Sequence, residues 1–360
     1  MREPYRVAVW GPGTMGTCAL RELRRLRETT LVSVRAYDKS KHGMDAGALI
    51  GAAPMGVRVT TDVNELLAEK PEVVLHTAQY YPQSPPDDDI VMLLKAGINV
   101  ITALPYQYPK SRGLEYVKLF DEAGKAGGAT LFGTGINPGF VYERLAPLMT
   151  GISNDIQCIR LDEFFNCEQL KNGAEILRLY GFGSTPEEIE KNPVAASIAS
   201  HFLPVGMHYL ADKLGLPLDR IERTSHHGIV SSDIVIPNVI TAKAGSVGTV
   251  SYRWTGYSGG KALFVIQVHW YLHESLRPSA AKGNDYWLLE IEGRPSSRLG
   301  LEIMGSMKNN QAMLESNPTP GAYFANVIAM IQAIPMVVEA APGLLIAAMP
   351  EVHWKPDMRM

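Results

Sequence analysis

Residues 7–23 constrain the fold of this chain more than any other segment, because few structures accommodate their order of patterns. They read VAVWGPGTMGTCALREL, which is an apolar run, a glycine turn spaced G-x-G-x-x-G and a helical repeat of apolar residues. A strand, turn and helix in that order place loop amides and a helix N-terminus where a pyrophosphate can bind. We therefore expect dinucleotide contacts at Gly11, Gly13, Thr14, Met15 and Gly16. The alternative is a tight turn that binds no ligand.

An acidic residue follows the glycine turn at the interval that nucleotide-binding units use. Asp38 ends the next predicted strand, 31–38, about twenty residues after Gly16. A carboxylate at that position accepts hydrogen bonds from an adenosine ribose and favours NAD. Lys39, Ser40 and Lys41 come directly after it and could instead hold a 2′-phosphate. The cofactor expected from these residues is therefore NAD or NADP.

The first 150 residues alternate between strand and helix patterns. Strands are predicted at 6–11, 31–38, 72–78, 99–104 and 130–135, and helices at 14–28, 62–70, 85–97 and about 112–126. This alternation predicts right-handed crossovers and a doubly wound parallel sheet of the Rossmann type over residues 1–150. A cofactor lies across the carboxyl ends of such strands. Four residues leaving those strands are expected at the cofactor: Thr77, Ala78, Ala103 and Asn137.

The pattern changes after residue 150. Residues 185–215 predict helix, with Thr185 as its N-terminal cap, and several later runs are rich in β-branched and aromatic residues. These runs predict an α+β domain at 151–317 with a mainly antiparallel sheet, for substrate binding and dimerisation. A C-terminal helix over about 318–360 is expected to complete the first domain. The apolar stretch 328–349 is interrupted by Gln332 and Glu339, so we expect a buried helix and a turn there.

Composition excludes several classes of function. The net charge is −3 and the pI is about 6.3, so we expect neither nucleic acid nor a membrane as a partner. The three cysteines are widely spaced, which predicts reduced thiols, a cytoplasmic protein and no metal site. No hydrolase or kinase motif occurs.

Four stretches together are similar to one family. They are GPGTMG (11–16), YDKSKHGMDAGALIG (37–51), GTGINPGF (133–140) and NPTPGAYFANVIAMIQAIP (317–335). They resemble the 2,4-diaminopentanoate dehydrogenase and amine dehydrogenase group of the dihydrodipicolinate-reductase-like family. The resemblance implies a homodimer that transfers hydride between NAD(P) and the nitrogen-bearing carbon of a small amine, giving a ketone and ammonia on oxidation.

One segment departs from the pattern of that group. The amine dehydrogenases carry an active-site glutamate after the fifth strand, just before a Tyr-Pro pair. The corresponding segment here is ALPYQYPK (103–110), which has Tyr108-Pro109 but no acid. A phenol can donate a proton, so Tyr106 and Tyr108 are candidate catalytic residues, and Asn137 is a third that could hold the cofactor or the substrate. Each has a structural alternative, as aromatic packing or as a turn residue.

Other polar residues have weaker claims to chemistry. His76 fits a core or cleft histidine better than a catalyst, and His226 and His227 point to opposite faces of a strand. Asp162 or Glu163 could supply the missing acid, although a solvated edge is the more ordinary assignment. Sheet packing is the default for the remaining candidates: Trp254, His269, Trp270 and His273.

Three functions therefore stay open. The first is an amine dehydrogenase-like enzyme. The second is a ketone, alcohol or cyclic imine reductase that lacks the ammonia-handling glutamate. The third is a dinucleotide-sensing protein without catalysis.

Overall fold

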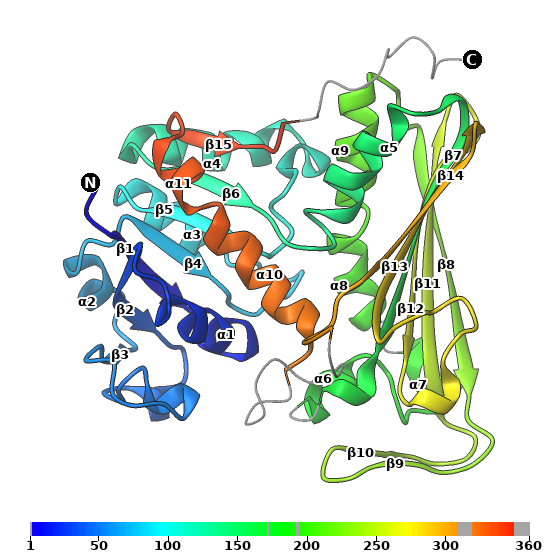
Figure 1. Ribbon diagram of the computed structural model, residues 1–360, viewed down its shortest axis with the longest axis horizontal. Helices are drawn as coiled ribbons and strands as arrows, with labels where there is room; N and C mark the ends of the chain where they lie inside the picture. The colour runs from blue at the N-terminus through cyan, green and yellow to red at the C-terminus, as the bar shows by residue number, and fades with distance from the viewer. Residues whose placement is uncertain (1, 171–172, 192–193, 308–318, 349–360) are drawn as a thin grey trace. The chain divides into compact units, whose positions relative to one another are not determined.

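The computed structural model describes residues 2–170, 173–191, 194–307 and 319–348 (Figure 1). The described chain divides into two compact units. The first unit contains residues 1–139 and 323–348, and the second contains residues 140–322. Each unit has its own sheet and its own buried core.

A seven-stranded parallel sheet forms the centre of the first unit. Its strand order is β15-β6-β5-β4-β1-β2-β3, and every neighbouring pair is parallel. The strands are β1 (Tyr5–Trp10), β2 (Thr29–Arg35), β3 (Val59–Thr60), β4 (Val73–His76), β5 (Asn99–Thr102), β6 (Thr130–Gly133) and β15 (Gly343–Leu345). The predicted parallel sheet is confirmed.

Helices pack against this sheet. They are α1 (Thr14–Leu23), α2 (Val63–Ala68), α3 (Asp87–Lys95), α4 (Leu114–Gly127), α10 (Gly321–Gln332) and α11 (Ile334–Glu339), with 3-10 turns at Lys39–Lys41, Ala48–Ile50 and Pro109–Arg112. Asp62 caps α2 by accepting a hydrogen bond from the Asn64 amide at 2.8 Å. Three aspartates open α3, where the positive end of the helix dipole stabilises them.

The C-terminal segment differs from its prediction. A single helix was expected from about residue 318, but α10 and α11 are followed by β15, which pairs with β6 at the edge of the sheet. The predicted residues 349–360 lie outside the described part of the chain. Residues Gly321–Glu339 are long and apolar enough to cross a membrane by length and composition. Half of their most apolar window is buried, and α11 packs on β5 and β6, as a core helix does.

A six-stranded sheet forms the second unit. Its order is β14-β13-β7-β12-β11-β8, in which only the β7–β12 pair is parallel, so the mainly antiparallel prediction is confirmed. The strands are β7 (Asn154–Asn166), β8 (Arg220–Ile229), β11 (Val247–Ser258), β12 (Lys261–Tyr271), β13 (Asp285–Arg294) and β14 (Ser297–Glu302). A separate hairpin consists of β9 (Ile234–Ile236) and β10 (Ile240–Ala242).

Helices of the second unit lie along one face of its sheet (Figure 1). They are α5 (Ala146–Thr150), α6 (Ala174–Leu179), α7 (Pro186–Lys191), α8 (Val194–Phe202) and α9 (Val205–Leu214), with a π-helix at Val141–Leu145 and 3-10 turns at Cys167–Gln169 and Glu274–Leu276. The helix expected over 185–215 is therefore three helices. Its predicted cap is present, because the Thr185 hydroxyl accepts from the Glu188 amide while Glu188 accepts from the Thr185 amide.

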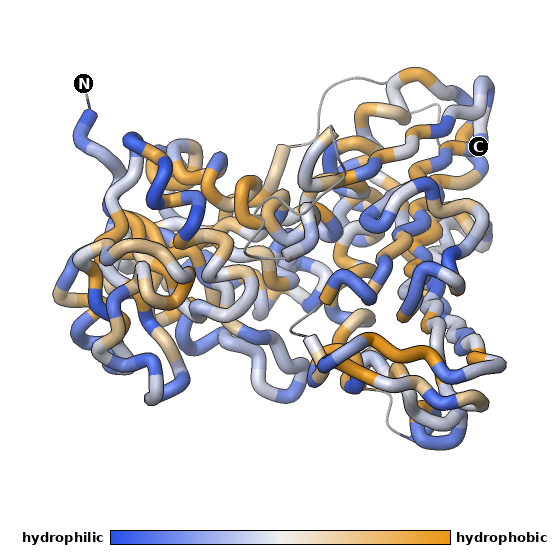
Figure 2. The backbone as a smooth tube through the Cα atoms, turned by 60° about the horizontal axis from the view of Figure 1, so that its bottom comes forward, coloured by the Kyte–Doolittle hydropathy of each residue, from blue (hydrophilic) through white to orange (hydrophobic). Residues whose placement is uncertain are grey.

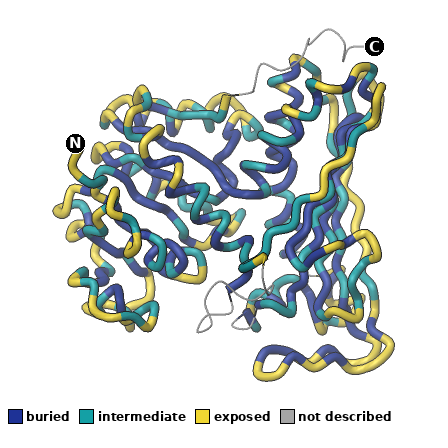
Figure 3. Tube along the Cα trace, viewed as in Figure 1, coloured by how far each residue is buried: buried dark blue, intermediate teal, exposed yellow. Residues whose placement is uncertain are grey.

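Both units bury their central strands. The four central strands of the parallel sheet are almost completely buried, as Figure 3 shows. Most outward turns are hydrophilic, whereas the strands and buried helices carry the hydrophobic stretches (Figure 2). In the parallel sheet this burial leaves the ends of the strands as the positions for polar chemistry.

Candidate active site

The glycine turn has the geometry of a dinucleotide cradle. Gly11 has a φ of +88°, which favours glycine, and a Cβ there would lie 2.9 Å from the Ala78 backbone. A Cβ on Gly16 would lie 2.4 Å from the Gly11 carbonyl oxygen, so helix and strand could not approach as they do. A Cβ on Gly13 would meet no protein atom within 4 Å. The protein therefore needs glycine at 11 and 16 for its own packing, and position 13 leaves room for a ligand.

Two of the residues predicted to contact the cofactor, Thr77 and Ala78, lie beside this turn. The Thr77 hydroxyl donates to the Gly11 carbonyl at 2.8 Å, which joins the end of β4 to the turn. Helix α1 begins with no side-chain cap, and Thr14 at its start is exposed. Its first amides are therefore available to an anionic group, and the structure brings Thr77 and Ala78 to the same place as the turn.

Asp38 was predicted to end the second strand, but β2 ends at Arg35 and Asp38 instead caps the 3-10 turn Lys39–Lys41 that follows. Its carboxylate is exposed and accepts hydrogen bonds from the Ser40 hydroxyl at 2.7 Å and the Ser40 amide at 2.9 Å. These two hydrogen bonds lower the pKa of Asp38 below its ordinary value. The Lys41 ammonium reaches back to the Pro12 carbonyl at 3.1 Å, and Lys39 is exposed in the same turn. Groups suited to a ribose and to a 2′-phosphate therefore both lie beside the glycine turn.

Aromatic residues and one guanidinium surround the ends of β1 and β2. The Arg35 guanidinium lies 3.8 Å from the ring centroid of Tyr37 and 4.5 Å from that of Trp10. The Trp10 indole donates to the Tyr37 hydroxyl, which itself donates to Asp89 at 2.6 Å. Burial and the hydrogen bond to Asp89 raise the pKa of Tyr37 to about 12. This network fixes a half-exposed tyrosine ring next to Asp38.

His76 ends β4 and is fully buried. Its ring stacks on that of Trp10, with centroids 5.9 Å apart, and its two nitrogens make no hydrogen bond to another described residue. Burial, together with the nearby Arg35 charge, lowers the pKa of His76 to about 3. The ring is therefore neutral at physiological pH, which agrees with a core histidine.

The segment 103–110 contains no acid, but an acid from another helix reaches it. Asp87, in the first turn of α3, accepts hydrogen bonds from the hydroxyls of Tyr106 at 2.5 Å and Tyr116 at 2.8 Å. Arg112 donates to the Tyr116 hydroxyl at 2.7 Å. The Tyr106 side chain is completely buried, and burial raises the pKa of its phenol well above the ordinary value. Tyr106 therefore stays protonated, with its proton directed to Asp87.

Replacing Asp87 with leucine is expected to destabilise the protein. The change leaves the buried Tyr106 hydroxyl without its carboxylate acceptor, and losing such a partner costs about 2 kcal/mol. Asp88→Leu is the matched control, because it removes an exposed carboxylate from the same helix turn. Urea unfolding of both variants checks the prediction. Equal unfolding free energies for Asp87→Leu and Asp88→Leu would contradict it.

Hydrogen bonds tie the segment after β5 to the segment after β6. The Gln107 amide group donates to the Thr134 carbonyl at 3.0 Å and to the Pro138 carbonyl at 3.5 Å. The Asn326 side chain, on α10, also holds the segment after β6 by accepting from the Ile136 amide at 2.8 Å. The structure thereby brings 103–110, with Ala103 and Tyr108, next to 133–140, which contains Asn137. Tyr108 is buried, and Asn137 is half-buried. The three candidate catalytic residues therefore belong to two adjoining loops.

The second unit has polar groups on both faces of its sheet. On the face away from α9, His269 hydrogen-bonds the Asp162 carboxylate at 2.9 Å and the Ser251 hydroxyl at 3.3 Å. Glu163 points to the opposite face. His226 and His227 lie on β8, and Trp254 is buried on β11. Within the described residues no group of three metal-binding side chains forms a metal site, and none of the three cysteines is in a disulfide.

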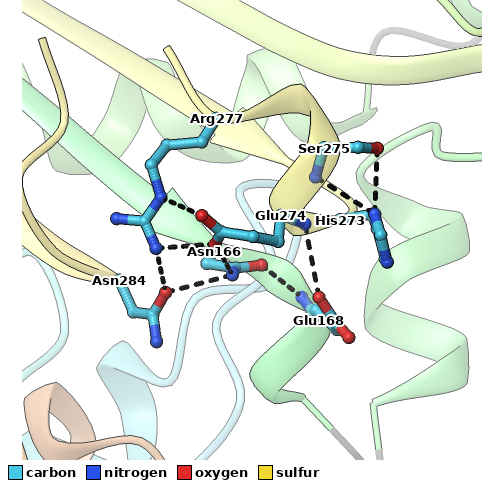
Figure 4. A network of polar contacts seen from close by, with 7 residues as sticks. All are labelled: Asn166, Glu168, His273, Glu274, Ser275, Arg277 and Asn284. Atoms are coloured by element: carbon cyan, nitrogen blue, oxygen red, sulfur yellow. Dashed lines mark hydrogen bonds and ion pairs between the residues drawn. The ribbon is translucent and has the colours of Figure 1, made fainter. Parts of the chain in front are cut away.

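A polar network holds the end of this sheet at which β7 stops and β13 begins (Figure 4). Arg277 donates two hydrogen bonds of 2.6 Å to Glu274 and one of 2.8 Å to Asn284, while Asn166 donates to Asn284. His273 bonds the Ser275 hydroxyl within this network. Asn284, a member of this network, directly precedes Asp285, the first residue of β13. The network therefore helps to position the Asp285 carboxyl.

Sequence reasoning did not find several of these residues. Three residues that make important contacts lie in no sequence motif: Asp87, Tyr116 and Asp285. Asp87 meets Tyr106 and Tyr116, and Asp285 meets Gln169, only after the chain has folded. The acidic first turn of α3 was visible in the sequence as a helix start, which gave no reason to expect Asp87 beside Tyr106.

Comparisons with known proteins cover nearly the whole chain. Residues 5–79 match the model of the dihydrodipicolinate reductase N-terminus, and residues 140–354 match that of the 2,4-diaminopentanoate dehydrogenase C-terminal domain. An amine dehydrogenase of Streptomyces virginiae is 27% identical over 347 residues, covering 93% of each chain. A 2,4-diaminopentanoate dehydrogenase of Acetoanaerobium sticklandii is 25% identical over 360 residues, covering 95% of this chain and 92% of the relative.

A solved structure has the same fold. The amine dehydrogenase from Mycobacterium smegmatis superposes with a TM-score of 0.76 at 21% identity, covering 97% of this chain and 98% of that one.

Proposed function

Since the chain belongs to the family defined by the 2,4-diaminopentanoate dehydrogenase C-terminal domain, we propose that it is an NAD(P)-dependent amine dehydrogenase. The reaction is hydride transfer between a nicotinamide and the nitrogen-bearing carbon of a small amine, with the ketone and ammonia on the other side. The resemblance expected from the four sequence motifs is confirmed by the family match and by both relatives.

The glycine turn carries the proposal. Gly11, Gly13 and Gly16 form a turn at the start of α1, a helix without a side-chain cap. A Cβ at Gly13 would have no protein atom within 4 Å, so this position is open to a ligand. The residues therefore fit a dinucleotide, with the turn and the amides of Thr14 and Met15 holding the pyrophosphate. Asp38 and Lys39 select the adenosine ribose or its 2′-phosphate. When bound, the cofactor supplies or accepts the hydride.

Residues of the two adjoining loops would then serve the reacting end of the cofactor. Ala103 bounds the space beside it, and Asn137 orients the carboxamide or the substrate, while Thr77 and Ala78 contact the cofactor at the glycine turn. Tyr108 is the proposed proton-handling residue, and Tyr106, which burial and its hydrogen bond to Asp87 keep protonated, is proposed as a positioning residue. The proposed roles of the domains are dinucleotide binding for 1–150 with 318–360 and substrate binding for 151–317. The proposed partners are a small amine or ketone and a second copy of the chain, in the cytoplasm.

A second candidate is a reductase of ketones, alcohols or cyclic imines. It is favoured by the segment 103–110, in which Leu104, Pro105, Tyr106 and Gln107 occupy the positions where the amine dehydrogenases carry a glutamate. The third possibility, dinucleotide sensing, predicts binding without turnover.

Ammonium dependence tests the proposed function. Purified protein is incubated with NADH or NADPH and a panel of small ketones, with and without ammonium, and cofactor oxidation is followed by absorbance. We expect ammonium to raise the rate at least about tenfold, since the nitrogen is a reactant. Gly13→Ala protein is the control for background oxidation. Equal rates without ammonium would establish the ketone reductase, and tight cofactor binding with no turnover would establish the sensor.

A further inference from the structure

Glu163 places a carboxylate on the face of the second unit's sheet that packs against α9. The register between β12 and β7 aligns Phe264 with Ile159, and the side chains alternate, so Ile159, Leu161 and Glu163 share the face on which α9 packs. Ile159 and Leu161 are completely buried, whereas Glu163 is half-buried. A carboxylate at this point costs desolvation energy, so its presence requires groups that stabilise it.

Two tryptophans supply such groups. The Trp270 indole on β12 donates to one carboxylate oxygen of Glu163 at 3.1 Å, and the Trp287 indole on β13 donates to the other at 2.9 Å. The donors come from the strands on both sides of β7, so they fix the orientation of the carboxylate. An indole N–H is a neutral donor, which orients a carboxylate without removing its negative charge.

Aromatic rings border this carboxylate, with the N–H edges of Trp270 and Trp287 turned toward it. The ring of Tyr180, at the end of α6, stacks on Trp270 with centroids 4.6 Å apart, and both rings are half-buried. The carboxylate attracts an organic cation through its charge, and the apolar rings beside it can contact the alkyl part of such a cation. The combination is more specific for an alkylammonium group than either element alone.

A second carboxyl lies on the same face. Asp285 is two residues before Trp287 on β13, is almost completely buried, and accepts hydrogen bonds from the Gln169 side chain at 3.1 Å and the Ala322 amide at 3.2 Å. Burial raises the pKa of Asp285 to about 6, and the charge of Glu163 adds to that shift. The face therefore holds a second, almost completely buried carboxyl, with a pKa of about 6, close to the oriented carboxylate.

We propose that Glu163, oriented by Trp270 and Trp287, is the binding site for the protonated amino group of the substrate. This proposal rests on the proposed function, because among the candidate functions only an amine dehydrogenase has such an amine as its substrate. The segment 103–110 has no acid, and the proposal assigns that role to Glu163 on β7. It assigns substrate recognition to residues of the second unit. The ligand class is a primary alkylammonium ion carried on a small apolar body.

Equilibrium binding without cofactor tests this assignment. The full-length protein is titrated with n-butylammonium chloride and with n-butanol, which has the same carbon chain and no charge, and indole fluorescence and calorimetry report binding. We expect the wild-type chain to prefer n-butylammonium and Glu163→Gln to bind it at least about tenfold more weakly. Glu292→Gln is the matched control, because Glu292 is an exposed carboxylate on the other face of the same sheet.

A second variant keeps the test decisive if Glu163→Gln fails to fold. Trp270→Phe preserves an aromatic ring and removes one indole donor, so n-butylammonium affinity should fall by about threefold to tenfold. Unchanged n-butylammonium affinity in a folded Glu163→Gln or Trp270→Phe protein overturns the proposal, as does equal wild-type affinity for n-butanol. The binding experiment contains no cofactor, so its result does not depend on whether the enzyme shows ammonium-dependent turnover. If turnover is observed but Glu163→Gln binds n-butylammonium as tightly as the wild type, only the proposed binding site is refuted and the proposed function stands.

Discussion

Gly13→Ala protein is expected to unfold at the wild-type temperature and to lose at least about a hundredfold in affinity for NADH and NADPH. An alanine Cβ at position 13 meets no protein atom within 4 Å, and the residue has a φ of −85°, outside the left-handed region that favours glycine. The added methyl group occupies the space in which the backbone would approach the pyrophosphate. Binding is measured by fluorescence titration, and stability by a thermal melt.

Gly16→Ala is the contrasting variant. Its Cβ would lie 2.4 Å from the Gly11 carbonyl oxygen, so the turn or helix α1 must move. We expect it to lose affinity and also about 1–3 kcal/mol of unfolding free energy, the usual cost of overpacking. A Gly13→Ala protein that binds both cofactors as tightly as the wild type would show that this turn is not the pyrophosphate site.

The parallel sheet was predictable from the sequence because its signals are local. A short apolar run followed by a turn and a helix can be recognised within about twenty residues, and five such runs correspond to β1, β2, β4, β5 and β6. The strand β15 was not predictable in this way. It has three residues in an apolar stretch that also contains a helix, so periodicity cannot separate them, and only its pairing with β6 makes it a strand.

The candidate site was predictable to the same limited extent. The glycine turn and Asp38 lie in one continuous segment with a characteristic spacing. Glu163 is hydrogen-bonded to Trp270 and Trp287, which lie 107 and 124 positions later in the sequence. Tyr106 is hydrogen-bonded to Asp87, which lies 19 positions earlier. No spacing rule connects such partners, because their proximity depends on strand order in each sheet. This is why Glu163 could be named as a possible acid while its indole donors could not.

Opposite pH dependences are expected from the buried groups His76 and Asp285. His76 has a folded pKa of about 3 against 6.5 when unfolded, so the unfolded chain binds the extra proton and stability falls as pH is lowered from 6.5 to 3. Asp285 has a folded pKa of about 6 against 3.8, so the folded chain binds the extra proton and stability falls as pH rises from 3.8 to 6. Each slope is about 1.4 kcal/mol per pH unit.

Between pH 4 and 6 the two slopes offset each other in the wild type, and single variants should separate them. His76→Phe keeps a ring that can stack on Trp10 and removes the rising contribution, so its unfolding free energy should fall relative to the wild type by about 3 kcal/mol from pH 4 to 6. Asp285→Asn removes the falling contribution, so its unfolding free energy should rise relative to the wild type by a similar amount. Urea unfolding at several pH values measures both differences. If the unfolding free energy of both variants changes with pH as it does in the wild type, then folding does not shift the pKa of His76 or of Asp285 as expected.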